Sequence, residues 1–336
     1  MSIRNRLWAA LCLPFLMLLL WMSAGMAFAS PERWRAEGWT KTDFSKTSVK
    51  FDEILSGGPP KDGIPSIDKP KFIPVKEEKE VGATEPVVGF ALNGDARAYP
   101  LRILMWHEIV NDVVGGVPVT VTYCPLCNSA IVFDRRLDGK VLDFGTTGKL
   151  RNSDLVMYDR QTESWWQQFT GTGIIGTYTG RQLATFPARL ESFERFKARH
   201  PDGKVLVPNI PSMRAYGRNP YVNYDLATRP FLYSGDLPEG INPMARVVVV
   251  YDGKESSAVS LDLLRRKGSL TLGATTLKWE PGQNSALEKE KISEGRDVGN
   301  VIARKKTAQG EVDVRYDVTF AFVYHAFHPE RTILKN

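Results

Sequence analysis

The strongest chemical signal in this chain is a pair of cysteines, Cys124 and Cys127, separated by Pro-Leu. This spacing brings two sulfur atoms close enough for a strained disulfide or for binding of one metal ion. In thioredoxin-like proteins the same spacing opens a helix, whose N-terminus lowers the pKa of one thiol. Here the apolar patterns of residues 117–123 and 128–135 predict strands on both sides of the pair. The sequence therefore predicts a loop between strands, outside the thioredoxin context.

His107 is the predicted partner of the two cysteines. It lies in a predicted helix, residues 101–112, a short connection before the strand of residues 117–123. Packing of this helix on that strand would bring the imidazole near Cys124 and Cys127. One imidazole and two thiolates form a soft ligand set for Cu(I), or for Zn(II) with a fourth ligand. The predicted accessory groups are Asp62, Glu108, Asp154, Met157 and Glu163, with Asp154, Met157 and Glu163 as candidates for the fourth ligand.

Other interpretations of the same residues stay open. The cysteines are also suited to thiol–disulfide exchange without a metal, or to a structural disulfide that staples a turn. A lone histidine near aromatic residues is often a hydrogen-bonded packing residue. With a structural disulfide, the protein would be a β-rich ligand-binding module whose pocket is lined by Trp165, Trp166 and Gln168. The sequence identifies no reaction or substrate, and it leaves open whether the protein is an enzyme.

The N-terminal residues indicate export. Arg4 and Arg6 precede a long apolar run, and Ala27-Phe28-Ala29 before Ser30 fits a signal-peptidase site. We therefore expect a cleaved signal peptide, residues 1–29, and a periplasmic or secreted mature chain. The alternative is an inner-membrane anchor over residues 7–29, which is long enough to span a bilayer. No later apolar stretch has that length, so no membrane span is expected in the mature chain.

Charge and composition narrow the classes of partner. The chain has 44 basic and 38 acidic residues, a net charge of +6, and the two signs are interspersed. This pattern is typical of a solvated surface and argues against nucleic-acid binding. The expected partners are a small ligand, a metal ion or a redox partner. Once Cys12 is removed with the signal peptide, Cys124 and Cys127 are the cysteines that remain.

The pattern along the chain predicts an α+β fold that is predominantly antiparallel β, with two or three short helices. Residues 30–86 form a Pro/Gly-rich arm, and residues 87–330 form a single mostly-β domain that carries the cysteine motif. No internal repeat is evident. Hairpin turns are predicted at 93–94, 138–139 and 252–253, helices at 101–112, 190–199 and 260–266, and a long final strand at 312–324.

Several motifs in one order resemble the bacterial domain-of-unknown-function family 3179. They are Gly57–Pro65, Arg97–Pro100, Trp106–Asp112, Tyr123–Cys127, Phe144–Gly145, Asp154–Arg160 and Thr162–Gln167. The likeness extends from about Phe51 to Pro329. It departs near the end, where Tyr324–Phe327 replaces a Trp-containing segment of the family. The resemblance implies an exported or membrane-associated protein and no established reaction, so any mechanism has to rest on the residues.

Overall fold

The computed structural model describes residues 30–253, 255–308 and 310–336. The predicted signal peptide, residues 1–29, and the alternative anchor over residues 7–29 lie outside these ranges. Within them, no helix combines the length and the apolar character that crossing a membrane requires.

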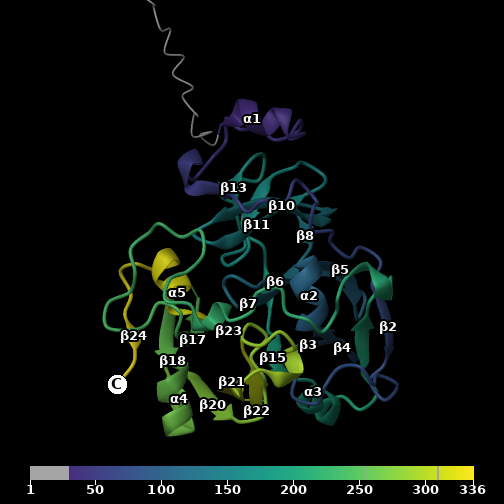
Figure 1. Ribbon diagram of the computed structural model, residues 1–336, viewed down its shortest axis with the longest axis vertical. Helices are drawn as coiled ribbons and strands as arrows, with labels where there is room; N and C mark the ends of the chain where they lie inside the picture. The colour runs from purple at the N-terminus through teal and green to yellow at the C-terminus, as the bar shows by residue number, and fades with distance from the viewer. Residues whose placement is uncertain (1–29, 254, 309) are drawn as a thin grey trace, which may run out of the picture.

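The described residues are mostly β, with 41% in strands and 15% in helices, arranged as a five-bladed β-propeller. This corrects the predicted α+β fold with two or three helices. The described part of the chain forms five sheets of four or five strands, together with one two-stranded ribbon. Figure 1 shows how the labelled strands are arranged. Alternation along a strand indicates which face is buried, but it carries no information about which sheet the strand joins. The sequence pattern therefore did not predict the number or the arrangement of the sheets.

The sheets are assembled mainly from antiparallel pairs, with β16–β4 and β18–β24 parallel. One sheet contains β1 (Ile54–Ser56), β10 (Phe144–Arg151), β11 (Asp154–Asp159), β12 (Trp165–Gln167) and β13 (Thr172–Ile175). A second contains β14 (Thr185–Phe186), β7 (Ser129–Asp134), β6 (Val117–Cys124) and β5 (Ile109–Val114). A third contains β15 (Arg189–Ser192), β3 (Pro86–Leu92), β4 (Asp95–Pro100), β16 (Lys204–Val207) and β2 (Lys71–Pro74).

The remaining strands come mostly from the C-terminal part of the chain. The fourth sheet contains β23 (Tyr316–Phe320), β17 (Arg246–Asp252), β18 (Glu255–Ser260) and β24 (Ile333–Leu334). The fifth contains β19 (Ser269–Leu272), β20 (Thr275–Glu280), β21 (Asn300–Thr307) and β22 (Gly310–Asp313). The ribbon pairs β8 (Arg136–Leu137) with β9 (Lys140–Val141).

The helices of the described residues are short, and four of the five directly follow a strand. The α-helices are α1 (Pro31–Ala36), α2 (Leu101–His107), α3 (Phe193–Arg199), α4 (Leu261–Lys267) and α5 (Ala321–Phe327). The 3-10 turns are Phe51–Glu53, Pro211–Met213, Tyr224–Leu226 and Ile292–Glu294. Each of α2 to α5 begins at the residue after a strand ends, which turns the chain sharply at the sheet margin.

The element order reveals an internal duplication, although no repeat was evident in the sequence pattern. In the first copy, β3-β4-α2-β5-β6 is a hairpin, a helix and a second hairpin, and α2 packs on all four strands. In the second copy, β17-β18-α4-β19-β20 has the same order, and α4 packs on its four strands. In both copies a further strand–helix–strand segment, β15-α3-β16 or β23-α5-β24, completes the sheet of the first hairpin.

A weak sequence signature accompanies this duplication. After α3 the chain reads His200-Pro201-Asp202, and after α5 it reads His328-Pro329-Glu330. Both histidines occupy the position that ends a seven-residue helix. The shared pattern is only three residues long and the two copies differ greatly elsewhere. The repeat is therefore recognised only after the helices and strands of the two copies are aligned. Figure 1 shows the first copy around α2 and β4 and the second copy around α4, β18 and β20.

The copies differ by a large insertion in the first. Residues 136–186 lie between β7 and β15, and they supply β10 to β13 of the uppermost sheet in Figure 1. The N-terminal arm adds β1 to this sheet and β2 to the third sheet. Trp34 and Trp39 of the arm pack against Trp165 of the insertion, with ring centroids 4.8 and 4.9 Å away.

Several predicted elements are confirmed, and others have different limits. Hairpin turns occur at 93–94 and 138–139 as expected. The third hairpin turns one residue later than expected, because Asp252 still pairs with Glu255 as the last residue of β17. The predicted helix 101–112 ends at His107 because Glu108 adopts φ 57°, after which β-branched residues continue as β5. The predicted helix at 190–199 begins at Phe193. The predicted strand 312–324 is wrong: it is the end of β22, then β23, then helix α5, whose first four residues are all buried.

Candidate functional site

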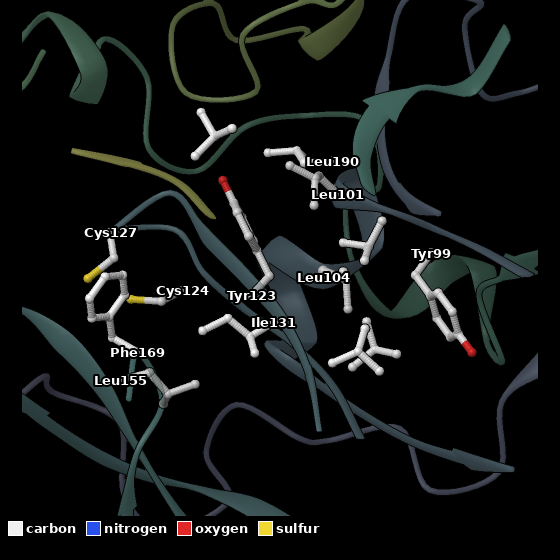
Figure 2. Packing of buried hydrophobic residues seen from close by; sticks show 14 of the residues in the cluster. Tyr99, Leu101, Leu104, Tyr123, Cys124, Cys127, Ile131, Leu155, Phe169 and Leu190 are labelled. Atoms are coloured by element: carbon white, nitrogen blue, oxygen red, sulfur yellow. The ribbon is translucent and has the colours of Figure 1, made fainter. Parts of the chain in front are cut away.

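The cysteine pair lies in the tight turn that joins β6 to β7. Cys124 is the last residue of β6, and the Cys127 backbone N–H donates to the Cys124 carbonyl at 3.2 Å. Asn128 then adopts φ 51°, which lets the chain reverse into β7. This confirms the predicted loop between strands. Both cysteines are free thiols, 1% and 0% exposed, and Figure 2 shows them in the buried cluster with Leu155 and Phe169.

Asp154 completes a group of three with these cysteines. It is the first residue of β11, so the inserted sheet delivers it to the turn of the first copy. The thiol sulfurs and a carboxylate oxygen of Asp154 all lie within 4.8 Å of one another. The neighbouring Ser153 carbonyl is 3.9 Å from the Cys124 sulfur and 3.5 Å from the Cys127 sulfur.

The two oxygens of Asp154 have different surroundings. Oδ2 accepts hydrogen bonds from Gln167 Nε2 at 2.6 Å and from the Phe169 backbone N–H at 2.9 Å. Oδ1 is fully buried and has no hydrogen-bond partner. A buried polar atom without a partner is unfavourable by about 1–3 kcal/mol, so its presence requires an explanation. The carboxyl group is held in place by these two nitrogen donors, and the Cys124 and Cys127 thiols, which are weak donors and partly offset the effect of burial on its pKa, are further polar neighbours.

Burial dominates the electrostatics of this region. It raises the pKa of the Cys124 thiol and raises that of Cys127 well above the usual range. Burial also raises the pKa of Asp154 to about 6. The pKa of Glu108 rises to about 8, through burial and then the charge of Asp154. No cationic side chain is among the main influences on these four pKa values, so the region favours a positive charge from outside the chain.

His107 lies outside the group of three. Its Nδ1 is 2.7 Å from the Pro65 carbonyl, and its Nε2 is 2.8 Å from the Tyr216 hydroxyl. The imidazole also stacks on the Tyr216 ring at a centroid distance of 5.8 Å, and burial lowers its pKa. These contacts tie helix α2 to the arm and to the long segment between β16 and β17. A role as metal ligand would require His107 to give up one of these hydrogen bonds.

The other predicted accessory residues are dispersed. Asp62 accepts a hydrogen bond from the Tyr158 hydroxyl, and Glu163 pairs with Lys61 at 2.6 Å. Met157 is fully buried in the core. The predicted pocket residues are also fully buried: Trp165 packs on the aromatic side chains of the arm, Trp166 donates to Asp159, and Gln168 donates to Thr122.

A cavity of about 340 Å³ lies beside the cysteine turn. Leu126 of the turn, Leu155 after Asp154, and Glu108 contribute to its wall. Its remaining lining residues are Gly57, Pro59, Ile64, Gly148, Lys149, Leu150, Tyr221, Tyr224 and Phe231. Sequence reasoning missed this cavity. The sequence feature that could have indicated it is the high density of aromatic residues in the segment after β16. Because these residues follow no regular spacing, they do not predict where the segment packs.

The long segment between β16 and β17 is attached over the site by specific contacts. The Tyr224 hydroxyl donates to the Leu126 carbonyl at 3.1 Å, and Ser153 Oγ donates to the Phe231 carbonyl at 2.5 Å. Both anchors belong to residues next to a member of the group of three. The cavity is therefore bounded by the cysteine turn, the start of β11 and this segment.

Comparisons with known proteins place the chain in a family without assigning a reaction. No match was found among curated proteins, and none among solved structures. The family model described as protein of unknown function, DUF3179, matches residues 61–331, which include the cysteine turn, Glu108, Asp154 and both copies of the duplication. The chain belongs to the DUF3179 family.

Proposed function

We propose that Cys124, Cys127 and Asp154 bind one zinc ion. The observation that carries this proposal is the unpartnered, fully buried Oδ1 of Asp154 beside two free thiols. A divalent cation would satisfy this oxygen and the two sulfurs together. It would also stabilise the deprotonated thiols and the carboxylate, which burial otherwise disfavours.

The donor set favours zinc over copper. Zinc accepts thiolate and carboxylate ligands together and binds four ligands with tetrahedral geometry. Cu(I) prefers sulfur ligands and gains less from a carboxylate oxygen. Three protein ligands leave a fourth position, the arrangement typical of zinc sites that bind water or a substrate.

Thiol–disulfide exchange is the second candidate. A Cys-x-x-Cys pair of free thiols with close sulfurs supports it, as both thiols can join in one disulfide. Exchange requires an accessible thiolate, however, and burial raises the pKa of both thiols while leaving them at most 1% exposed. We therefore rank it below zinc binding.

Metal titration of the reduced protein tests the proposal. Zinc is titrated against a chromophoric chelator, and Cu(I) is titrated in parallel under anaerobic conditions. We expect one tightly bound zinc ion per chain, and no zinc binding after Cys124→Ser with Cys127→Ser. Asp154→Asn should weaken zinc binding by about tenfold to a hundredfold, since it removes an anionic ligand. A reduced wild type that takes up no zinc would exclude the proposal.

Two controls make the result specific. Asp159→Asn changes a fully buried aspartate on the same strand whose carboxylate is already bonded to Thr162 and Trp166, and it should leave zinc affinity unchanged. His107→Gln tests the ligand predicted from the sequence. We expect it to change zinc affinity less than threefold, because both imidazole nitrogens already have partners.

We also infer that the protein acts outside the cytoplasm. The Ala27-Phe28-Ala29 site after the apolar run supports cleavage before Ser30. The intact mass of protein from a periplasmic fraction tests this: a mature chain should begin at or near Ser30. A mass that includes residues 1–29 would favour the membrane anchor instead.

A further inference from the structure

The cavity beside the cysteine turn is mostly apolar but contains an unusual polar group. Glu108 is 8% exposed and lines the cavity, and its carboxyl group makes no hydrogen bond or ion pair among the described residues. The cationic neighbour in the wall, Lys149, is paired with Glu37 at 2.6 Å. An unpaired buried carboxyl group is strongly unfavourable unless a partner arrives from outside the chain.

The internal duplication shows that Glu108 is not required by the local backbone. Glu108 ends helix α2 with φ 57° and ψ −32°, and Gly268 ends the matching helix α4 with φ 69° and ψ −38°. Glycine is the usual residue for this left-handed conformation, because a side chain strains it. The second copy has the residue that the fold prefers. The first copy has a strained glutamate whose side chain contributes to the cavity wall.

Tyr221 supplies a second polar group at the same wall. Its hydroxyl makes no hydrogen bond among the described residues, and the Tyr221 side chain lines the cavity with Glu108. The two groups complement each other: a carboxyl oxygen accepts a hydrogen bond, and a phenol O–H donates one. The rest of the lining is dominated by leucine, isoleucine, proline and aromatic side chains.

We propose that this cavity binds an uncharged, apolar alcohol or phenol whose hydroxyl group is held between Glu108 and Tyr221. The ligand hydroxyl donates to a Glu108 carboxyl oxygen and accepts from the Tyr221 hydroxyl, which satisfies both groups at once. The apolar part of the ligand fills the space beside Leu126, Leu155 and Leu150. A negatively charged ligand is disfavoured, because Lys149 of the wall is already paired with Glu37, Glu108 would repel the ligand's charge, and burial would remove its water.

The cavity of about 340 Å³ suits a ligand of one or two rings. This proposal goes beyond metal binding and does not depend on it, since neither Glu108 nor Tyr221 belongs to the group of three. Because Leu126 and Leu155 line the cavity, the bound alcohol or phenol would lie next to the group formed by Cys124, Cys127 and Asp154. The two sites are therefore separable by experiment even though they share neighbouring residues.

Fluorescence titration of the purified full chain with 2-naphthol tests this proposal. 2-Methylnaphthalene, in which a methyl group replaces the hydroxyl, and 2-naphthoate, which is charged, are measured by displacement of 2-naphthol. We expect saturable binding of 2-naphthol that is about tenfold tighter than binding of 2-methylnaphthalene, and weaker binding of 2-naphthoate. Absence of saturable 2-naphthol binding, or equal affinity for the naphthol and its methyl analogue, would overturn the proposal.

Variants locate the site. Tyr221→Phe and Glu108→Leu should each reduce the preference for the hydroxyl by about threefold to tenfold, whereas Glu108→Gln, which keeps an accepting oxygen, should retain most of it. Ile64→Trp should fill the cavity and block both compounds. Tyr233→Phe removes the hydroxyl of a tyrosine outside the cavity lining and should have no effect. An unchanged preference in Tyr221→Phe would exclude the assigned contact.

A zinc titration of the same variants keeps this proposal distinct from the previous one. Tyr221→Phe and Tyr233→Phe should bind zinc as the wild type does. Loss of 2-naphthol binding with retained zinc binding supports the cavity assignment. Retained 2-naphthol binding in Cys124→Ser with Cys127→Ser would show that the organic ligand site persists when the proposed metal ligands are removed.

Discussion

The two copies of the duplicated unit share a scaffold but differ where the second hairpin meets the next strand and where the helix ends. In the first copy, β6 leads into the cysteine turn, and Glu108 directly follows the last residue of helix α2. In the second copy, β20 ends at Glu280 before Pro281, and helix α4 ends at Gly268. The second copy therefore shows that the same element order forms without a cysteine pair or a glutamate at these respective positions. The departures of the first copy from it mark the residues that folding does not explain.

The insertion accounts for the rest of the difference. Asp154 belongs to the inserted sheet, and Gln167 of the same sheet orients its carboxyl group. The described structure provides no such sheet between β21 and β23 of the second copy, where β22 follows directly. The first copy joins β6 to β7 by the short cysteine turn, whereas the second joins β20 to β21 by the long segment 281–299. The insertion brings Asp154 to the cysteine turn and so forms the group of three.

The largest expected effect is stabilisation of the first copy by zinc. At a free zinc concentration a thousandfold above the dissociation constant, binding should raise the free energy of unfolding by about 4 kcal/mol. Chemical denaturation of the reduced wild type with and without zinc measures this. Cys124→Ser with Cys127→Ser should remove the zinc-dependent part. A zinc effect of equal size in that double variant would place the metal elsewhere.

Matched core substitutions should separate scaffold from site. Leu104 in α2 and Leu264 in α4 occupy equivalent, fully buried positions. Replacing either with alanine should lower the free energy of unfolding by about 3 kcal/mol, since each leaves a cavity in a packed core. Under folded conditions, Leu104→Ala should also weaken 2-naphthol binding, because α2 positions Glu108. Weakening of similar size in Leu264→Ala would contradict the assignment of function to one copy.

The metal-free protein should show a pH dependence that originates from Asp154. Its folded pKa of about 6 lies above the unfolded value, so the folded state binds the proton more tightly. Metal-free wild type should therefore lose about 2 kcal/mol of stability relative to Asp154→Asn as the pH rises from about 4 to 6. Urea unfolding of both proteins across this range provides the measurement. A constant difference between them would show that Asp154 is not a strained buried acid.

The smallest effect concerns the two helix ends. Glu108→Gly should stabilise the metal-free protein by about 1 kcal/mol, because it relieves a left-handed residue and removes a buried carboxyl group. Gly268→Ala should destabilise it by a similar amount, because alanine is strained at φ 69°. Thermal unfolding compares the two variants. If Glu108→Gly destabilises the protein, Glu108 has a structural role and the cavity proposal loses its main support.

Local chemistry made part of the site predictable. Cys124 and Cys127 were recognisable from their spacing, and the strands on both sides of them from alternation, because both signals lie within a few residues. Asp154 was identified as an accessory group, but nothing local distinguished it from Asp62 or Glu163. Those two carboxylates lie against Tyr158 and Lys61, whereas the carboxylate of Asp154 lies within 4.8 Å of both cysteine sulfurs. That distinction depends on contacts between segments far apart in the chain.

The sequence by itself determined two hairpin turns, the strands on both sides of the cysteine pair, the cysteine pair itself and the family. Only the tertiary structure decided the five-bladed arrangement, the duplication, and the choice of Asp154 over His107 as the neighbour of the thiols. The physical reason is that alternation and turn residues act over a few positions, whereas sheet membership is decided by long-range pairing. His107 at the end of helix α2 stacks on Tyr216 because the segment after β16 folds back over the helix. No pattern within the helix or within that segment predicts this contact.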